Sequence, residues 1–186
     1  MGTDDRSRLV AELAEYRRVG LDSSGCIYFL RQIQPHASLV RAVLELAASG
    51  AMEVELPGIV QAELMYGPYA TGRPEDRYAV LAFMEAPGVA VAPITRDVLF
   101  ASAQIRALTK GQMKLPDALV VASCAIGRCQ ALIANDRVFR SLDALTGMAL
   151  MPVPGQRYAL PRYLHLDDYA QGEAQPRSVS GRGSHG

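Results

Sequence analysis

The sequence predicts an α/β fold, in which a three-layer α/β/α arrangement surrounds a central parallel sheet of about four to five strands. Short apolar segments alternate along the chain with longer segments of helical periodicity, the pattern of a parallel sheet covered by helices on both faces. The chain has 186 residues, of which 49% are apolar and 20% charged. A single domain of this size can bury a core without disulfides.

The expected elements are bounded by glycine and proline, the usual end signals of helices and strands. The expected strands cover residues 19–22, 52–56, 89–93, 130–134 and 149–153. The expected helices cover residues 5–18, a stretch from 23 that Pro35 ends, 36–49, a stretch around Glu63 that Gly67 and Pro68 end, 75–86, 95–110 and 117–126. We therefore expect an N-terminal helical extension over 1–18, the main domain over 19–153, and a partly disordered C-terminal extension over 154–186.

Charge and cysteine content narrow the class of protein. The 19 basic and 19 acidic residues cancel, which argues against a protein that holds nucleic acid mainly through its total charge. The three cysteines match neither a zinc site nor a C-x-x-C pair, so we expect them to be reduced core residues. We find neither a signal peptide nor an apolar run of about 20 residues that a membrane span needs. We expect a cytoplasmic protein without a membrane partner.

Four acidic residues stand where such a sheet places its ligands. Asp22 and Asp136 directly follow apolar strands, whereas Glu63 and Asp117 lie in the first turns of helices. Ligands of open α/β sheets bind beyond the carboxyl ends of the strands. The four acids are therefore expected to meet at one edge of the sheet.

Each acid also has a purely structural interpretation. Asp22 is placed to cap the helix that follows it, and Glu63 fits the solvated stripe of an amphipathic helix. Asp117 is favoured by the dipole of a helix that is apolar almost all round, and Asn135-Asp136 is ordinary turn chemistry. Burial of Asp117 favours a functional role, because a buried acid needs a partner or a cation.

Together with their neighbours, the four acids resemble a known family. The segments LDSSGCIYFL, AELMYG, LPDALVVASCA and LIANDRVF are similar, in this order, to the motifs of PIN domains, and particularly of VapC-type toxins. The similarity runs from about Val19 to Val153. The chain departs from the family pattern at Ala134, where threonine is frequent, and at Pro57, where serine is common.

The resemblance implies a metal-dependent endoribonuclease that leaves a 5′-phosphate and a 3′-hydroxyl. It implies Asp22, Asp117 and Asp136 as ligands of Mg²⁺ or Mn²⁺, with Glu63 completing the catalytic set. Ser23 would assist through its hydroxyl and Asn135 would support the site. It also implies a tRNA, rRNA or mRNA substrate, a cognate antitoxin in a type II toxin–antitoxin system, and a homodimer.

Basic residues beside the acidic segments are candidates for RNA contacts, although each also fits a solvated helix face. They are Arg106, Lys110, Lys114 and Arg137. The three histidines lie outside the four motifs, which argues against a histidine mechanism and predicts that each is a surface or tail residue.

Other functions remain open to different degrees. A haloacid-dehalogenase-type phosphotransfer protein would need an acid at the second position after Asp22, where this chain has Ser24. A dinucleotide-binding protein would need a glycine-rich turn there. A PIN scaffold acting as an RNA-binding or regulatory module, or a housekeeping RNA-processing nuclease, is the serious alternative.

Overall fold

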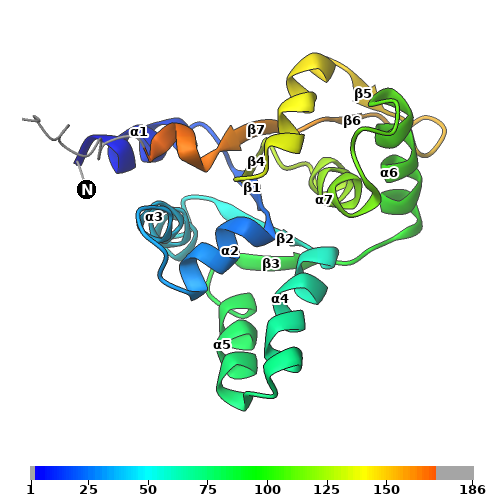
Figure 1. Cartoon of the computed structure of the whole chain (residues 1–186). Helices are drawn as coiled ribbons and strands as arrows, with labels where there is room; N and C mark the ends of the chain where they lie inside the picture. Colours follow the sequence, from blue (N-terminus) through cyan, green and yellow to red (C-terminus); the bar gives the residue numbers. More distant parts are fainter. Residues whose placement is uncertain (1–2, 171–186) are drawn as a thin grey trace, which may run out of the picture.

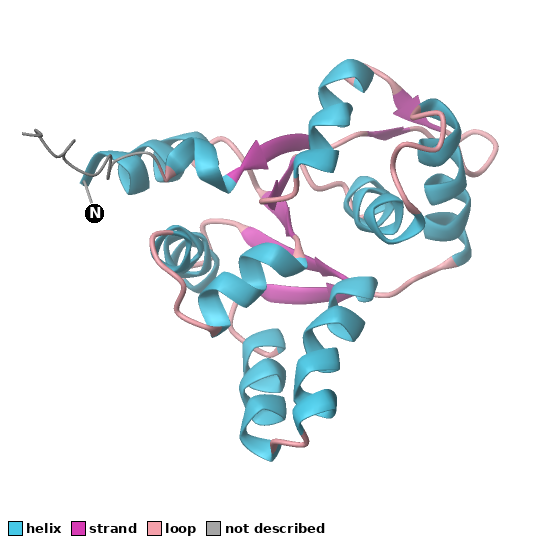
Figure 2. Ribbon diagram, in the orientation of Figure 1, coloured by secondary structure: helices cyan, strands magenta, loops and turns pink. Residues whose placement is uncertain are grey.

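A five-stranded parallel sheet forms the centre of the molecule (Figures 1 and 2). We describe residues 3–170 of the chain in a computed structural model. The strand order is β3-β2-β1-β4-β7, and every neighbouring pair runs parallel. The strands are β1 (Arg18–Leu21), β2 (Glu53–Pro57), β3 (Val89–Ala92), β4 (Ala131–Ala134) and β7 (Arg162–His165). The predicted α/β fold class and parallel sheet are confirmed.

Helices cover both faces of this sheet. They are α1 (Thr3–Leu13), α2 (Ser23–Leu30), α3 (His36–Ala48), α4 (Gly58–Thr71), α5 (Pro74–Met84), α6 (Arg96–Leu108), α7 (Leu115–Ile126) and the 3₁₀ helices η1 (Arg137–Leu145) and η2 (Leu166–Tyr169). Figure 1 shows α6 and α7 on one side of the sheet, α2 and α3 on the other, and the α4–α5 pair projecting away from it. None of the helices in the described part of the chain is long and apolar enough to cross a membrane.

Helix α7 lies between the sheet and α6, and for this reason nearly its whole surface is buried. Its residues from Ala118 to Ala125 are all buried, as a segment apolar on every side requires. The helix approaches β1 so closely that a Cβ at Gly20 would lie 2.2 Å from Cys124 Sγ. Glycine at this position therefore lets α7 pack directly on the sheet.

Helix α1 packs on the domain through an apolar side formed by Leu9 in its middle and Leu13 at its C-terminal end. Leu9 and Leu13 are 0% and 1% exposed, and the helix contacts α3 and η2. Glu12 pairs with Arg162 Nη1 at 2.7 Å and accepts a hydrogen bond from the Tyr169 hydroxyl. The N-terminal helix thus joins the C-terminal segment of the described chain to the core.

Several expected boundaries are wrong. The first helix, expected over residues 5–18, is α1 and ends at Leu13, and Arg18 already belongs to β1. Helix α4 does not end at Gly67 and Pro68 but continues to Thr71, and Gly72 ends it with a left-handed φ of 67°. The Thr71 hydroxyl donates to the Gly67 carbonyl at 3.1 Å, and Pro68 is buried. Burial of Pro68 offsets the backbone hydrogen bond that proline cannot make.

The last expected strand, 149–153, is also wrong as a member of the central sheet. Its first residues form β5 (Ala149–Leu150), which pairs antiparallel with β6 (Tyr158–Ala159) in a separate two-stranded sheet. The fifth strand of the central sheet is β7, which lies in the stretch after residue 153.

Candidate functional site: four carboxylates at the carboxyl ends of the strands

The four acids follow the elements from which they were expected. Asp22 comes directly after β1 and caps α2, and Asp136 comes two residues after β4 and caps η1. Asp117 lies in the first turn of α7 as expected, whereas Glu63 lies in the second turn of α4, the helix after β2, and the expectation that it stands in a first turn is wrong. Since β1 and β4 are parallel neighbours, Asp22 and Asp136 leave the sheet at the same edge.

Asp22 is the most buried of the four, at 6% exposed. Its Oδ2 accepts hydrogen bonds from the Ser24 amide at 3.3 Å and from the Ser24 hydroxyl at 2.9 Å. Its own amide donates to the Ile133 carbonyl of β4 at 3.0 Å, which fixes the end of β1 against β4. Burial raises the pKa of Asp22, and the negative charge of Asp136 raises it further.

Glu63 and Asp117 are in the same electrostatic environment. Burial raises the pKa of Glu63, and the charges of Asp22 and Asp117 add to this rise. The Ser23 hydroxyl donates a hydrogen bond to Glu63 and acts in the opposite direction. Burial also raises the pKa of Asp117, with further contributions from Asp136 and Asp22, while Lys114 opposes the rise.

Asp136 is exposed, as is Glu63. Its Oδ1 accepts a hydrogen bond from the Val138 amide at 3.0 Å, so the structural interpretation as a helix cap holds for it as it does for Asp22. Its charge nevertheless raises the pKa of both Asp22 and Asp117. Capping and a place in the acidic cluster are therefore compatible.

The charges of neighbouring acids thus act on Asp22, Glu63 and Asp117, and the assignment of the four acids as one catalytic site stays a prediction. Among residues 3–170 none of the four forms an ion pair with lysine, arginine or histidine. In the same range, no group of three or more His, Cys, Asp or Glu side chains is arranged so that it could hold a metal ion. The donors still fit Mg²⁺ chemically, because Mg²⁺ prefers carboxylate oxygens, keeps several waters and takes only one or two carboxylates directly. The individual ligands stay a prediction.

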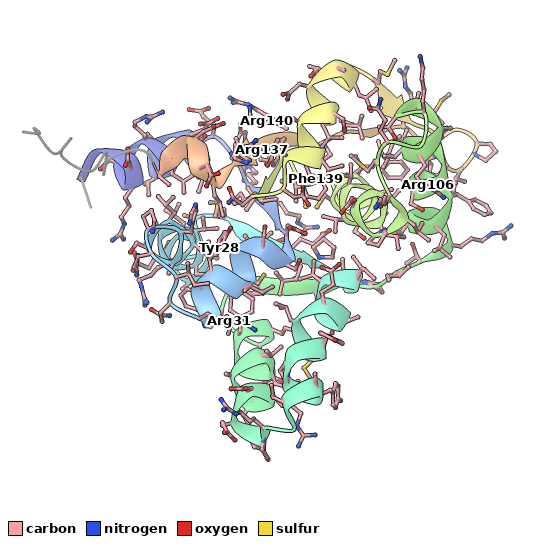
Figure 3. The ribbon with its side chains drawn as sticks, viewed as in Figure 1. Tyr28, Arg31, Arg106, Arg137, Phe139 and Arg140 are labelled. Atoms are coloured by element: carbon pink, nitrogen blue, oxygen red, sulfur yellow. The ribbon has the colours of Figure 1, made fainter. Side chains whose placement is uncertain are left out.

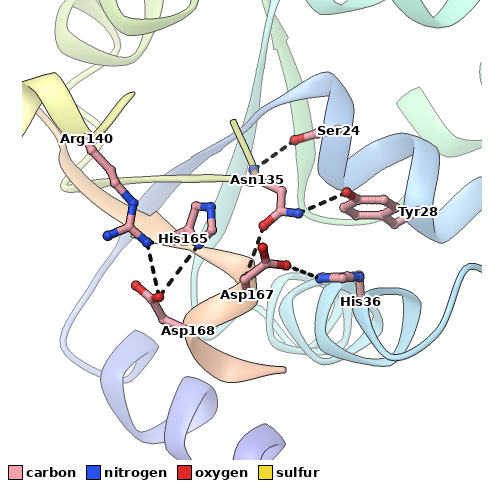
Figure 4. Close-up of polar contacts among 8 residues, drawn as sticks. All are labelled: Ser24, Tyr28, His36, Asn135, Arg140, His165, Asp167 and Asp168. Carbon is pink, nitrogen blue, oxygen red and sulfur yellow. Dashed lines mark hydrogen bonds and ion pairs between the residues drawn. The ribbon is translucent and has the colours of Figure 1, made fainter. Parts of the chain in front are cut away.

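Polar side chains that the sequence did not single out fix the loop that carries Asp136 (Figure 4). The Asn135 amide donates to Ser24 Oγ at 3.0 Å, and its side-chain Nδ2 donates to the Tyr28 hydroxyl at 2.9 Å. The Tyr163 hydroxyl donates to the Asp136 carbonyl at 2.8 Å. Asn135 was expected to support the site, whereas the part played by Ser24, Tyr28 and Tyr163 depends on contacts that no local motif reveals.

The four basic candidates differ in their relation to the acids. Lys114 lowers the pKa of Asp117, and Arg137 follows Asp136 directly at the start of η1. Figure 3 shows Arg106 on α6, away from Arg137 on η1. Lys110 is exposed after the end of α6. Proximity to the acids thus supports Lys114 and Arg137 as RNA contacts more than Arg106 and Lys110.

The expectation that every histidine is a surface or tail residue is wrong for His165 and incomplete for His36. His165 ends β7 and is 4% exposed, with its ring edge against Tyr163. His36 begins α3, where its ring stacks on Tyr28 with centroids 4.4 Å apart. A histidine flanked by apolar residues in a buried strand gives no sequence signal that separates it from a surface one. His185 lies outside the described residues.

Comparisons with known proteins agree with this architecture. The fold is similar to that of VapBC2 from Rickettsia felis, in a crystal structure bound to a DNA fragment from the VapBC2 promoter. The TM-score is 0.57, and the sequence identity is 19% over 67% of this chain and 92% of that one. The fold is similar as well to that of DNA-bound VapBC from Salmonella typhimurium, with a TM-score of 0.54 and 19% identity over 81% of this chain and 98% of that one.

Identities this low show a shared fold and nothing more. A search of the curated proteins found no match. The model of the PIN domain, a family of nucleases, matches residues 19–145, which is more than half of the chain and contains all four acids. The chain is therefore a member of the PIN-domain family.

Proposed function

We propose that this protein is a metal-dependent endoribonuclease that hydrolyses RNA phosphodiester bonds with Mg²⁺ or Mn²⁺. The observation that carries the proposal is the cluster of four carboxylates, in which neighbouring acids raise the pKa of Asp22, Glu63 and Asp117, and which has no ion pair with a basic side chain in the described chain. Such a group is costly unless a cation binds to it. A hard divalent cation is the partner that oxygen donors of this kind favour.

In this proposal Asp22, Asp117 and Asp136 hold the ion. When bound, the ion supplies Lewis acidity, which makes water a stronger nucleophile and offsets the negative charge that builds on the phosphate. Glu63 would accept a proton from the attacking water, because its raised pKa brings it closer to the working pH of a general base. Ser23 orients the Glu63 carboxylate through its hydroxyl, and Lys114 and Arg137 contact phosphates of the RNA.

The deciding experiment is cleavage of a mixed pool of tRNA and rRNA. Wild type is compared with Asp117→Asn, each with Mg²⁺, with Mn²⁺ and with EDTA. We expect cleavage by the wild type that needs the metal and that the substitution abolishes. If folded wild-type protein free of any inhibitor cuts nothing in either metal, the chain is an RNA-binding or regulatory module instead.

We further propose that the protein is the toxin of a type II toxin–antitoxin pair. The support is the structural similarity to two VapBC complexes. Induced expression of the wild type is expected to stop growth, and Asp117→Asn to remove this effect. Co-expression of a small DNA-binding protein from the neighbouring reading frame is expected to restore growth. Growth that is unaffected by induction points to a housekeeping RNA-processing nuclease.

A homodimer is part of the same proposal. The mass of one chain is 20.1 kDa, so light scattering during gel filtration separates a dimer clearly from a monomer. A mass of one chain at about 100 μM protein would contradict a stable homodimer.

A further inference from the structure

A closed set of contacts joins the C-terminal 3₁₀ helix η2 to the loop that carries Asp136 (Figure 4). Its centre is Asn135, whose side-chain amide is held at both ends. Asn135 Nδ2 donates to the Tyr28 hydroxyl at 2.9 Å, and Asn135 Oδ1 accepts from the Asp167 amide at 3.1 Å. Both side-chain hydrogen bonds of Asn135 are therefore made with groups outside its own loop.

The two partners of Asn135 are connected to each other through His36. Asp167 Oδ1 lies 2.8 Å from His36 Nε2, and the His36 ring stacks on Tyr28 at an interplanar angle of 22°. Helices α2, α3 and η2 thus meet around one asparagine. We call Tyr28, His36 and Asp167 the clamp.

The clamp is linked to the carboxylates by two short paths. The Asn135 backbone amide donates to Ser24 Oγ at 3.0 Å, and the Ser24 hydroxyl donates to Asp22 Oδ2 at 2.9 Å. Asp136 is the next residue in the chain after Asn135. Fixing Asn135 therefore fixes the direction in which Asp136 leaves β4 relative to the carboxylate of Asp22.

We propose that Tyr28, His36 and Asp167 are positioning residues, which set the metal affinity of the carboxylate site by holding Asn135 between Asp22 and Asp136. The inference rests on the proposed function. It goes beyond it by including η2, which lies after the residues 19–145 that the family model matches. Groups that orient metal ligands from the outside typically contribute about 10- to 100-fold in metal affinity or activity.

Two substitutions test the clamp without removing a carboxylate of the site. Tyr28→Phe deletes the hydroxyl that Asn135 contacts and keeps the ring that stacks on His36. Asp167→Ala breaks the contact with His36 and keeps the backbone amide that donates to Asn135. We expect each substitution to weaken Mn²⁺ binding by about 10-fold, measured by calorimetric titration on the full chain.

Matched controls separate positioning from general effects. Tyr158→Phe removes a tyrosine hydroxyl that bonds to Gln156 in the β5–β6 region. Asp168→Ala removes the same charge as Asp167→Ala one residue further on, where the partners are Arg140 and His165. Both controls are expected to bind Mn²⁺ within about 2-fold of the wild type, because neither touches Asn135.

Cleavage kinetics give a second measurement. At low Mn²⁺ the clamp variants are expected to lose kcat with an unchanged KM for RNA, and excess Mn²⁺ is expected to restore kcat. Clamp variants that are folded and bind Mn²⁺ like the wild type would overturn the inference, and so would a wild type that binds no Mn²⁺. A wild type that binds Mn²⁺ without cutting RNA would refute the nuclease alone, and the difference in Mn²⁺ affinity would still decide the clamp.

Discussion

Truncation of Leu9 measures whether helix α1 is part of the folding unit. Leu9 is 0% exposed, and α1 contacts α3 and η2. Leu-to-alanine substitutions at buried sites cost about 2.7–5.0 kcal/mol, the larger values belonging to sites that cannot collapse around the cavity. For a fully buried leucine between helices we expect a loss of roughly 3–4 kcal/mol in the free energy of unfolding. In a domain of this length each kcal/mol shifts Tm by about 2–4 °C, so Tm should fall by roughly 6–16 °C.

Urea denaturation followed by circular dichroism, together with a thermal melt, measures the loss. Leu99→Ala is the matched control, because Leu99 is 48% exposed on α6 and its truncation should cost less than about 1 kcal/mol. A Leu9→Ala protein that unfolds at the same urea concentration as the control would refute the docking of α1. The same result would remove one support of η2, since α1 and η2 are in contact.

Three further predictions concern charge and metal. Burial raises the pKa of Glu55 above its ordinary 4.5, so the stability that its protonated form contributes is complete below pH 4.5 and is lost as the pH rises through the folded-state pKa. Glu55→Gln should therefore raise Tm more at pH 8 than at pH 4. The substitution removes the 3.7 Å ion pair of Glu55 with Arg18, but Arg18 keeps its ion pair with Glu53. Mg²⁺ at about 100 times its Kd should stabilise the wild type by about 2.7 kcal/mol in a thermal shift assay, and EDTA should cancel the gain, whereas an unchanged Tm would argue against a metal site. Reversing the charges of Lys114 and Arg137 together should weaken RNA binding and reduce its salt dependence, and equal affinity in a low-salt titration would exclude both as phosphate contacts.

The parts of the fold that the sequence predicts correctly are those with a local signal. β4 is an unbroken apolar run, β1 is apolar after Arg18, and a polar residue follows each of them. A fully buried helix such as α7 is apolar on every side. β7 has no such signal, because its sequence RYLH contains two basic residues. It becomes buried only through tertiary contacts, among them the bond from the Tyr163 hydroxyl to the Asp136 carbonyl.

The residues of the site likewise fall into two groups, those with a local sequence signal and those without one. The acids were singled out because Asp22 and Asp136 stand after strands and Asp117 stands at a helix start, and because the order of all four resembles that of a family. The clamp could not be predicted, since Asp167 and His36 are 131 residues apart and neither lies in a motif. Only the return of the chain through β7, beside β4, brings η2 to Asn135.

The position of β7 has a practical consequence for any shortened version of this protein. A fragment that stops where the family match ends, at residue 145, would lack β7 and leave one side of β4 without a partner strand. All four residues of β4 are buried, so the fragment would present an apolar strand with free amide and carbonyl groups. Such edges recruit strands from other chains and lead to aggregation. Insolubility of such a fragment would therefore reflect the loss of β7. Fragments for expression should retain at least residues 3–170.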